Sequence, residues 1–259
     1  MNTLLMTLPT VKPAIAVQDV SHSFAGADGG RLCVLQNVSF LIPKGQFVCL
    51  LGTSGCGKST LLNLLSGFIQ PTLGEVRVEG RPISRPRRTN ICVSQDCSVF
   101  PWLTVEQNIG FGLQDLSSNE REAEIERTIG LVRLNGFENA YPHQLSGGMR
   151  QRVELARALV VKPSLIFMDE PFGALDSMTR EKLRNDLLAI WQQERNTIVF
   201  VTHDLDEALL LADRILVLSR RPATICADIE LSSARLRQSN SYDLLETRKR
   251  LYELLHCDE

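Results

Sequence analysis

Eight consecutive residues have the types and the spacing of a phosphate-binding loop. They read Gly52-Thr53-Ser54-Gly55-Cys56-Gly57-Lys58-Ser59 and match the pattern G-x-x-x-x-G-K-[ST]. Glycines let the backbone approach an anion closely, and the N–H groups at a helix start point at it. The lysine adds positive charge near the β- and γ-phosphates, and the serine offers a hydroxyl to Mg²⁺. The pattern predicts nucleotide binding, because a chance match is expected in roughly one such chain in a hundred at ordinary glycine frequency.

The segments on either side of this loop have the patterns of a strand and a helix. The apolar run 46–51 is short enough for a buried strand, and 60–66 has helical apolar spacing and stops at Gly67. Strand, glycine-rich loop and helix are the arrangement that binds phosphate.

Polar residues follow three further apolar runs that we predict to be buried strands. Gln95 follows 90–94, Asp169 and Glu170 follow 164–168, and His203 follows 197–202. Apolar strands that alternate with helices predict an α/β fold with a mainly parallel sheet. Ligands in such folds bind beyond the carboxyl ends of the strands, so all four segments point to one site.

Two adjacent carboxylates suit the hydrolysis of a nucleotide. Asp169 is placed to hold Mg²⁺, and Glu170 to orient and polarise an attacking water as a general base. An Asp-Glu pair after an apolar run is about equally often a helix cap or a loop, and a lone histidine such as His203 is more often structural than catalytic.

Several further motifs together resemble the ATPase subunits of ABC transporters over residues 15–225. Residues 145–152 resemble the signature motif, 165–171 the Walker B segment and 173–176 the D-loop. Gln95 matches the Q-loop glutamine and His203 the switch histidine. Two departures are Met149, where glutamine is common in the signature, and Phe24, which replaces the usual tyrosine but keeps ring stacking on adenine.

The resemblance implies a role for each matched residue, with ATP and Mg²⁺ as cofactors. The implied catalytic residues are Glu170, His203 and Gln95, and the implied metal ligands are Ser59, Gln95 and Asp169. The implied nucleotide-binding residues are Phe24, Gly52, Thr53, Ser54, Gly55, Cys56, Gly57, Lys58, Ser59, Thr60, Ser146, Gly147, Gly148 and Asp176.

The resemblance also implies the architecture. We expect a P-loop NTPase core of RecA type with an N-terminal antiparallel β subdomain, formed by residues 15–95 and 157–228. A helical subdomain carrying the signature is expected at 96–156, and a helical tail at 229–259. In this family the signature of one subunit faces the phosphate loop of another, which implies a head-to-tail homodimer or related heterodimer with C2 symmetry.

Composition narrows the class of protein. The 259 residues carry 28 Lys+Arg against 30 Asp+Glu, a net charge of −2, which does not favour a nucleic-acid partner. No apolar run is long enough for a spanning helix, and no signal peptide is apparent. Seven scattered cysteines without a C-x-x-C pair indicate a reduced, cytosolic chain.

The resemblance therefore implies an importer subunit at the cytoplasmic face of the plasma membrane. Its partners would be separate permease subunits and, indirectly, a substrate-binding protein. The amino-acid sequences of residues 100–105, 170–176 and 214–225 resemble the corresponding segments of the nitrate, sulfonate, taurine and bicarbonate importer branch. The alternatives are an ATPase of this superfamily that acts on DNA, or a ribosomal factor with two tandem ATPase halves. Only one phosphate loop and no heptad run occur here.

Two surface segments have two interpretations each. Phe100, Pro101 and Trp102 either pack inside the helical region or form a surface that receives a short helix of the membrane subunit. Residues 81–88 carry four arginines and form either a solvated loop or a basic surface for a partner.

Overall fold

A six-stranded sheet forms the centre of the protein. The computed structural model describes residues 12–26, 29–95, 98–173, 175–231 and 242–256. The strand order is β10-β9-β3-β8-β7-β6. All neighbours pair in parallel except β10, which is antiparallel to β9. The strands are β3 (Phe47–Leu51), β6 (Asn90–Val93), β7 (Leu165–Asp169), β8 (Thr197–Thr202), β9 (Arg214–Leu218) and β10 (Ile225–Glu230).

A four-stranded antiparallel sheet lies over one side of this centre. Its order is β2-β1-β4-β5. The strands are β1 (Ile15–Ala25), β2 (Arg31–Ile42), β4 (Leu73–Val78) and β5 (Arg81–Pro82). β2 is one continuous strand of 12 residues, and its pairing with β1 shifts register three times. The irregular burial pattern of β2 follows these bulges, which explains why the sequence pattern breaks.

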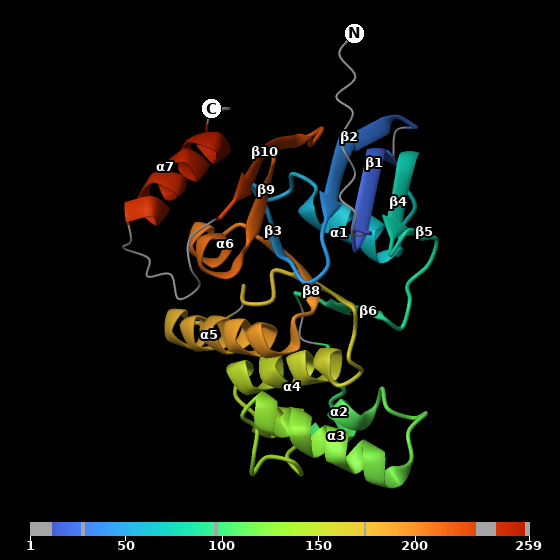
Figure 1. Cartoon of the computed structure of the whole chain (residues 1–259), viewed down its shortest axis with the longest axis vertical. Coiled ribbons are helices and arrows are strands. Elements are labelled where there is room, and N and C mark those ends of the chain that lie inside the picture. Colours follow the sequence, from blue (N-terminus) through green and yellow to red (C-terminus); the bar gives the residue numbers. More distant parts are fainter. Residues whose placement is uncertain (1–11, 27–28, 96–97, 174, 232–241, 257–259) are drawn as a thin grey trace.

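Eight helical segments complete the described part of the chain, and α2, α3 and α4 gather at the end of the molecule away from the antiparallel sheet (Figure 1). They are α1 (Lys58–Ser66), α2 (Val105–Gly110), α3 (Ser118–Leu131), the 3₁₀ turn η1 (Pro142–Gln144), α4 (Gly147–Leu159), α5 (Ser177–Glu194), α6 (Leu205–Leu211) and α7 (Tyr242–His256).

The central sheet separates two hydrophobic cores. Alternate residues of β3 belong to different cores, as expected where side chains alternate across a strand. Val48 and Leu50 pack with α1 and the antiparallel sheet, whereas Phe47, Cys49 and Leu51 pack on the side of α4, α5 and α6. Both faces of the central sheet are covered, which confirms the α/β expectation.

The last strand and the last helix show where the central sheet ends and how the C-terminal tail packs. β10 pairs with β9 through Glu230, so the central sheet continues past residue 228. α7 packs Leu244 and Leu251 into the core beside α6, and Arg248 donates to Asp206 at 2.9 Å. The tail is therefore docked on the core through α7. Among the described residues, no helix is long and apolar enough to cross a membrane.

Candidate active site

The candidate residues lie where four parallel strands end at one edge of the sheet. The strand ends are in register: Leu51 of β3 is opposite Thr202 of β8, and Asp169 of β7 is opposite Val201. β6 ends beside them, since its Val93 is opposite Met168. The loops that follow these strands therefore converge, as the sequence predicted.

The phosphate loop presents a free helix start and one buried cation. α1 begins at Gly57 without any side-chain cap, so its first N–H groups have no partner within the helix. Lys58 is only 5% exposed and donates from Nζ to the carbonyl oxygens of Gly52 at 2.9 Å and Thr53 at 3.0 Å. The φ of Gly57 is +125°, which excludes most other residues there. The loop is thus built to face an anion with backbone donors and a positive charge.

The carboxylate of Glu170 lies between the ammonium group of Lys58 and the ring of His203. Its Oε1 lies 3.7 Å from Nζ of Lys58, and its Oε2 lies 3.0 Å from Nδ1 of His203. Its backbone has a φ of +44°, a left-handed conformation that is uncommon for a non-glycine residue and is found at functional sites. The N–H of Glu170 donates to the carbonyl of Val201 at 3.0 Å, which ties this conformation to β8.

Hydrogen bonds of the neighbouring residue Thr202 stabilise the turn that carries His203. Thr202 Oγ1 donates to Glu207 at 2.6 Å and accepts from the Asp204 N–H at 2.9 Å. Burial raises the pKa of the Glu207 carboxyl, and the Thr202 hydrogen bond opposes this. The ring of His203 is about half exposed and contacts Glu170 from a position outside the cleft lining.

Asp169 fits a metal ligand. Its Oδ1 is buried and has no hydrogen-bond partner in the structure, although buried carboxylate oxygens are normally paired. Burial raises the pKa of the Asp169 carboxyl, while a hydrogen bond with Ser59 opposes this shift. Within the described residues no group of three or more His, Cys, Asp or Glu side chains could hold a metal alone. Hard oxygen ligands shared with substrate phosphates and water are what Mg²⁺ uses, so Asp169 and Ser59 fit it.

A cleft of about 340 Å³ brings eight of the expected residues together, whereas Asp169 and His203 lie outside its lining. Its lining, besides one further arginine, consists of Ser54, Gly55, Gly57, Lys58, Ser59, Thr60, Gln95 and Glu170. Phe24 lies outside this lining, at the end of β1, where its ring is 43% exposed and meets His22 edge-on at 4.6 Å. Its exposed face is free to stack on a flat ligand.

The signature and D-loop residues open helices away from this cleft. Ser146 caps α4, with its Oγ accepting from the Met149 N–H at 3.3 Å. Asp176 caps α5, and hydrogen bonds from Thr179 hold the pKa of its carboxyl below the usual range. Neither residue lines the cleft of its own chain. Ala174, within the D-loop, lies outside the described residues.

The two signature glycines differ in their surroundings. A Cβ on Gly148 would lie 2.6 Å from Thr179 Cγ2, so this glycine is needed for the close approach of α4 to α5. A Cβ on Gly147 would lie 3.7 Å from the nearest atom, in Leu175. Packing within the chain therefore accounts for Gly148 but not for Gly147.

The segment that follows Gln95 is hydrogen-bonded to α4. Glu154 of α4 is almost fully buried and accepts from Ser98 Oγ at 2.8 Å and from the Ser98 N–H at 3.3 Å. Arg157 of α4 donates to the Ser98 carbonyl and lies 4.2 Å from the centre of the Phe100 ring. Burial raises the pKa of the Glu154 carboxyl, and the Ser98 hydrogen bonds oppose this. The segment after Gln95 is thus fastened to the helix that carries the signature.

Comparison with known proteins decides the family. The model of the ABC transporter family matches residues 35–173, more than half of the chain. The chain belongs to the ABC transporter family. The resemblance inferred from the motifs is confirmed, and with it the assignment as an ATPase, since ATP-binding proteins of the ABC family hydrolyse ATP to drive transport.

Relatives at high identity cover most of the chain. The aliphatic sulfonates import ATP-binding protein SsuB of Bacillus cereus is 42% identical over 92% of this chain and 94% of its own length. The nitrate import ATP-binding protein NrtD of Synechococcus elongatus is 43% identical over 77% of this chain and 74% of its own length.

A solved ABC cassette has the same fold. The dimeric structure of an ATP-binding cassette in a post-hydrolysis state, bound to ADP and Pi, superimposes with a TM-score of 0.73 at 30% identity. The match covers 85% of this chain and all of that one. The ABC ATPase cassette fold expected from the motifs is therefore confirmed.

Two residues at or near this site, Arg221 and Glu154, were not predicted from the sequence. Arg221 lines the cleft, although the sequence drew attention to it only as part of a branch-like segment. It follows β9, another parallel strand, so the rule that found Gln95 and His203 also applied to it. Glu154 carried no such signal, because its partner Ser98 lies 56 positions away in the chain.

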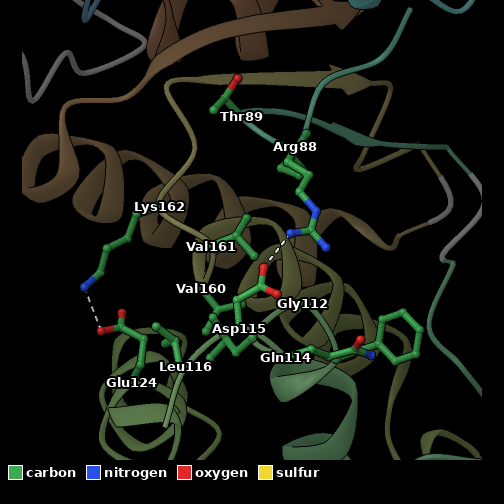
Figure 2. A pocket seen from close by; sticks show the side chains of 13 residues that line it. Arg88, Thr89, Gly112, Gln114, Asp115, Leu116, Glu124, Val160, Val161 and Lys162 are labelled. Carbon is green, nitrogen blue, oxygen red and sulfur yellow. Dashed lines mark hydrogen bonds and ion pairs between the residues drawn. The ribbon is translucent and has the colours of Figure 1, made fainter.

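A second, more apolar groove lies between β6 and the helical region (Figure 2). Its volume is about 580 Å³. Figure 2 shows Val160, Val161 and Leu116 along it, with the ion pairs Arg88–Asp115 and Lys162–Glu124 at its sides. Arg88 thus pairs with a carboxylate of the helical region, so part of the arginine-rich loop 81–88 is engaged within the chain.

Proposed function

We propose that the chain is the ATP-hydrolysing subunit of an importer for a small oxyanion, such as a sulfonate or nitrate. The observation that supports the ATPase activity is the position of Glu170, which lines one cleft with Lys58 and contacts both Lys58 and His203. The importer half rests on the sulfonate and nitrate import proteins to which the chain is similar. An ATPase acting on DNA or ribosomes is not favoured by these relatives.

In the proposed mechanism, Glu170 is the general base. Its carboxylate takes a proton from the water that attacks the γ-phosphate, and His203 Nδ1 holds that carboxylate in place from 3.0 Å. Lys58 exchanges its backbone carbonyl partners for phosphate oxygens when the nucleotide binds. Gln95 lines the same cleft, where its amide would face the γ-phosphate of the bound nucleotide.

A magnesium ion would be held by Ser59 and Asp169, with Gln95 near it. Bound there, the ion would neutralise charge on the β- and γ-phosphates. Asp169 supplies the buried, unpartnered oxygen that such an ion needs.

The active unit in this proposal is a head-to-tail dimer. Ser146, Gly147 and Gly148 form an anion site at the start of α4, and that site lies outside the cleft of its own chain. A second copy, or a related subunit, would place this site and Asp176 over the nucleotide. Gly147, which has room around it in the single chain, is then the glycine required by the close approach of a ligand.

The docking surface for the permease is proposed to start at Trp102, which is 70% exposed. Its ring lies 5.5 Å from Phe100, and Phe100 lies 4.6 Å from Phe111, which lines the apolar groove of Figure 2. Interior packing of Trp102, the other interpretation of the sequence, is wrong. Residues 96–156 are proposed to act as one helical subdomain that carries both this surface and the signature.

We expect Trp102→Ala to weaken binding of the permease by about 2 kcal/mol, because an exposed aromatic anchor is lost. ATP affinity should be unchanged, since Trp102 does not line the nucleotide cleft. The measurement is a pull-down with the permease subunit, beside nucleotide titration and thermal melting of the isolated chain.

Tyr252→Ala is a matched control for this experiment. Tyr252 is 56% exposed on α7, at the opposite end of the molecule from α2 (Figure 1). Its removal should leave permease binding as in the wild type. Normal assembly of the Trp102→Ala chain, or an equal loss in both variants, would contradict a docking role for Trp102.

The proposed function itself is tested by co-purification from the native membrane. We expect a polytopic permease to be isolated with the chain at the cytoplasmic face, and ATP turnover of that complex to rise with a sulfonate- or nitrate-loaded binding protein. Association with ribosomes or with DNA, weakening steeply as salt is raised, would refute the transport assignment.

A further inference from the structure

The fifth parallel strand ends at the same edge of the sheet as the phosphate loop. β9 pairs in parallel with β3, with Leu51 opposite Val217. The next residue, Leu218, has its carbonyl oxygen 3.2 Å from where a Cβ on Gly52 would lie. The turn after β9 therefore begins beside the first glycine of the phosphate loop, and its side chains can reach the nucleotide cleft.

This turn is fixed by bonds that do not involve the side chain of Arg221. The Ser219 N–H donates to the Thr224 carbonyl at 3.0 Å, and the Thr224 N–H donates to Ser219 Oγ at 2.9 Å. Ala223 is fully buried and exchanges two backbone hydrogen bonds with β2, at 2.8 Å and 2.9 Å. The position of Arg221 is thus set by the backbone.

The guanidinium of Arg221 faces the phosphate loop. Arg221 lines the same cleft as Lys58 and Glu170, and its Nη2 would be 3.8 Å from a Cβ on Gly55. It forms no ion pair with any carboxylate in the described ranges of the chain. Burial raises the pKa of the neighbouring Cys56 thiol, and the charges of Lys58 and Arg221 both oppose that rise. The guanidinium of Arg221 therefore lies beside the loop.

We propose that Arg221 is a further nucleotide-binding residue, which donates to the phosphate oxygens common to ADP and ATP. The inference rests on the proposed function in that it takes the cleft of Lys58 as the nucleotide site. An arginine suits this role because its planar fork matches phosphate oxygens and stays charged. Arg221 lies on the Gly55 side of the loop, so it supplies a second cation in addition to Lys58.

The test is the affinity for ADP, measured by calorimetry with Mg²⁺ and without ATP, so that no ATP-bound dimer contributes. We expect Arg221→Ala to weaken ADP binding by about tenfold, the lower end for a hydrogen bond to a charged group at an exposed site. Arg221→Lys should lose less, because charge remains while the fork is lost. The difference between wild type and Arg221→Ala should shrink at high salt.

Arg220→Ala is the matched control, since it removes the same charge from the neighbouring position, which does not line the cleft. It should bind ADP within about twofold of the wild type, as expected for a screened surface charge. Equal ADP affinity of Arg221→Ala and wild type would overturn the proposal. This holds even if Arg221→Ala hydrolyses ATP more slowly, because Arg221 would then act at the dimer interface and not on the nucleotide of its own chain. Wild type that binds no ADP would overturn both this proposal and the proposed function.

Discussion

Glu170→Gln is expected to bind ATP as the wild type does but to hydrolyse it about 10²–10⁴-fold more slowly, the range for a positioned general base. The amide keeps the shape of the carboxylate and a partner for His203 Nδ1, which lies 3.0 Å away. It cannot take the proton of the attacking water. It also removes the negative charge 3.7 Å from Lys58, so phosphate binding should not suffer.

Three measurements together identify the role of Glu170. Phosphate release measures turnover, and calorimetry measures ATP affinity. Size-exclusion chromatography with ATP measures the dimer, which should accumulate because the slow hydrolysis of ATP delays its dissociation. Glu126→Gln, the same change at an exposed position of α3, should hydrolyse ATP normally. Near-normal turnover of Glu170→Gln would remove Glu170 from the base role.

Ser146→Arg is expected to abolish hydrolysis while leaving ATP binding to the isolated chain intact. Ser146 is exposed and lies outside the nucleotide cleft of its own chain. A bulky cation there would occupy the space that the nucleotide of a second subunit needs. The cost to folding should be about 1 kcal/mol for a lost helix cap, which is small against the stability of a domain. Turnover, ATP affinity and the ATP-dependent dimer are again the measurements.

A second capping serine provides the control. Ser117 is exposed and caps α3 in a capping box with Glu120, so Ser117→Arg makes the same substitution at a similar helix start. It should lower the melting temperature comparably and leave turnover nearly unchanged. Normal ATPase activity of Ser146→Arg would show that the site is not shared between chains.

Mixing two inactive variants tests the shared site directly. Lys58→Ala lacks a working phosphate loop, and Ser146→Arg lacks a working signature. In a heterodimer, the intact loop of one chain meets the intact signature of the other, so one working site per mixed dimer is expected. Complete inactivity of a mixture that does form dimers would contradict the head-to-tail arrangement.

Local sequence specified the phosphate loop and the strand ends of this site. The loop and its helix are contiguous, and Gly57 at φ +125° has to be glycine for local steric reasons. The short apolar runs before Gln95, Asp169 and His203 predict buried strands, and parallel strands bring their carboxyl ends to one edge. Residue type and periodicity therefore sufficed for the α/β fold and for most of the cleft.

Contacts between residues far apart in the chain determined the features that the sequence did not predict. The contact of Glu154 with Ser98, the ion pair of Arg88 with Asp115 and the 70% exposure of Trp102 each depend on how the helical region packs, and no local pattern encodes them. The same holds for Arg221, whose place in the cleft follows from β9 pairing with β3 rather than with another strand. Periodicity tells which face of an element is buried, but the partner of that face is set by the free energy of packing the whole chain.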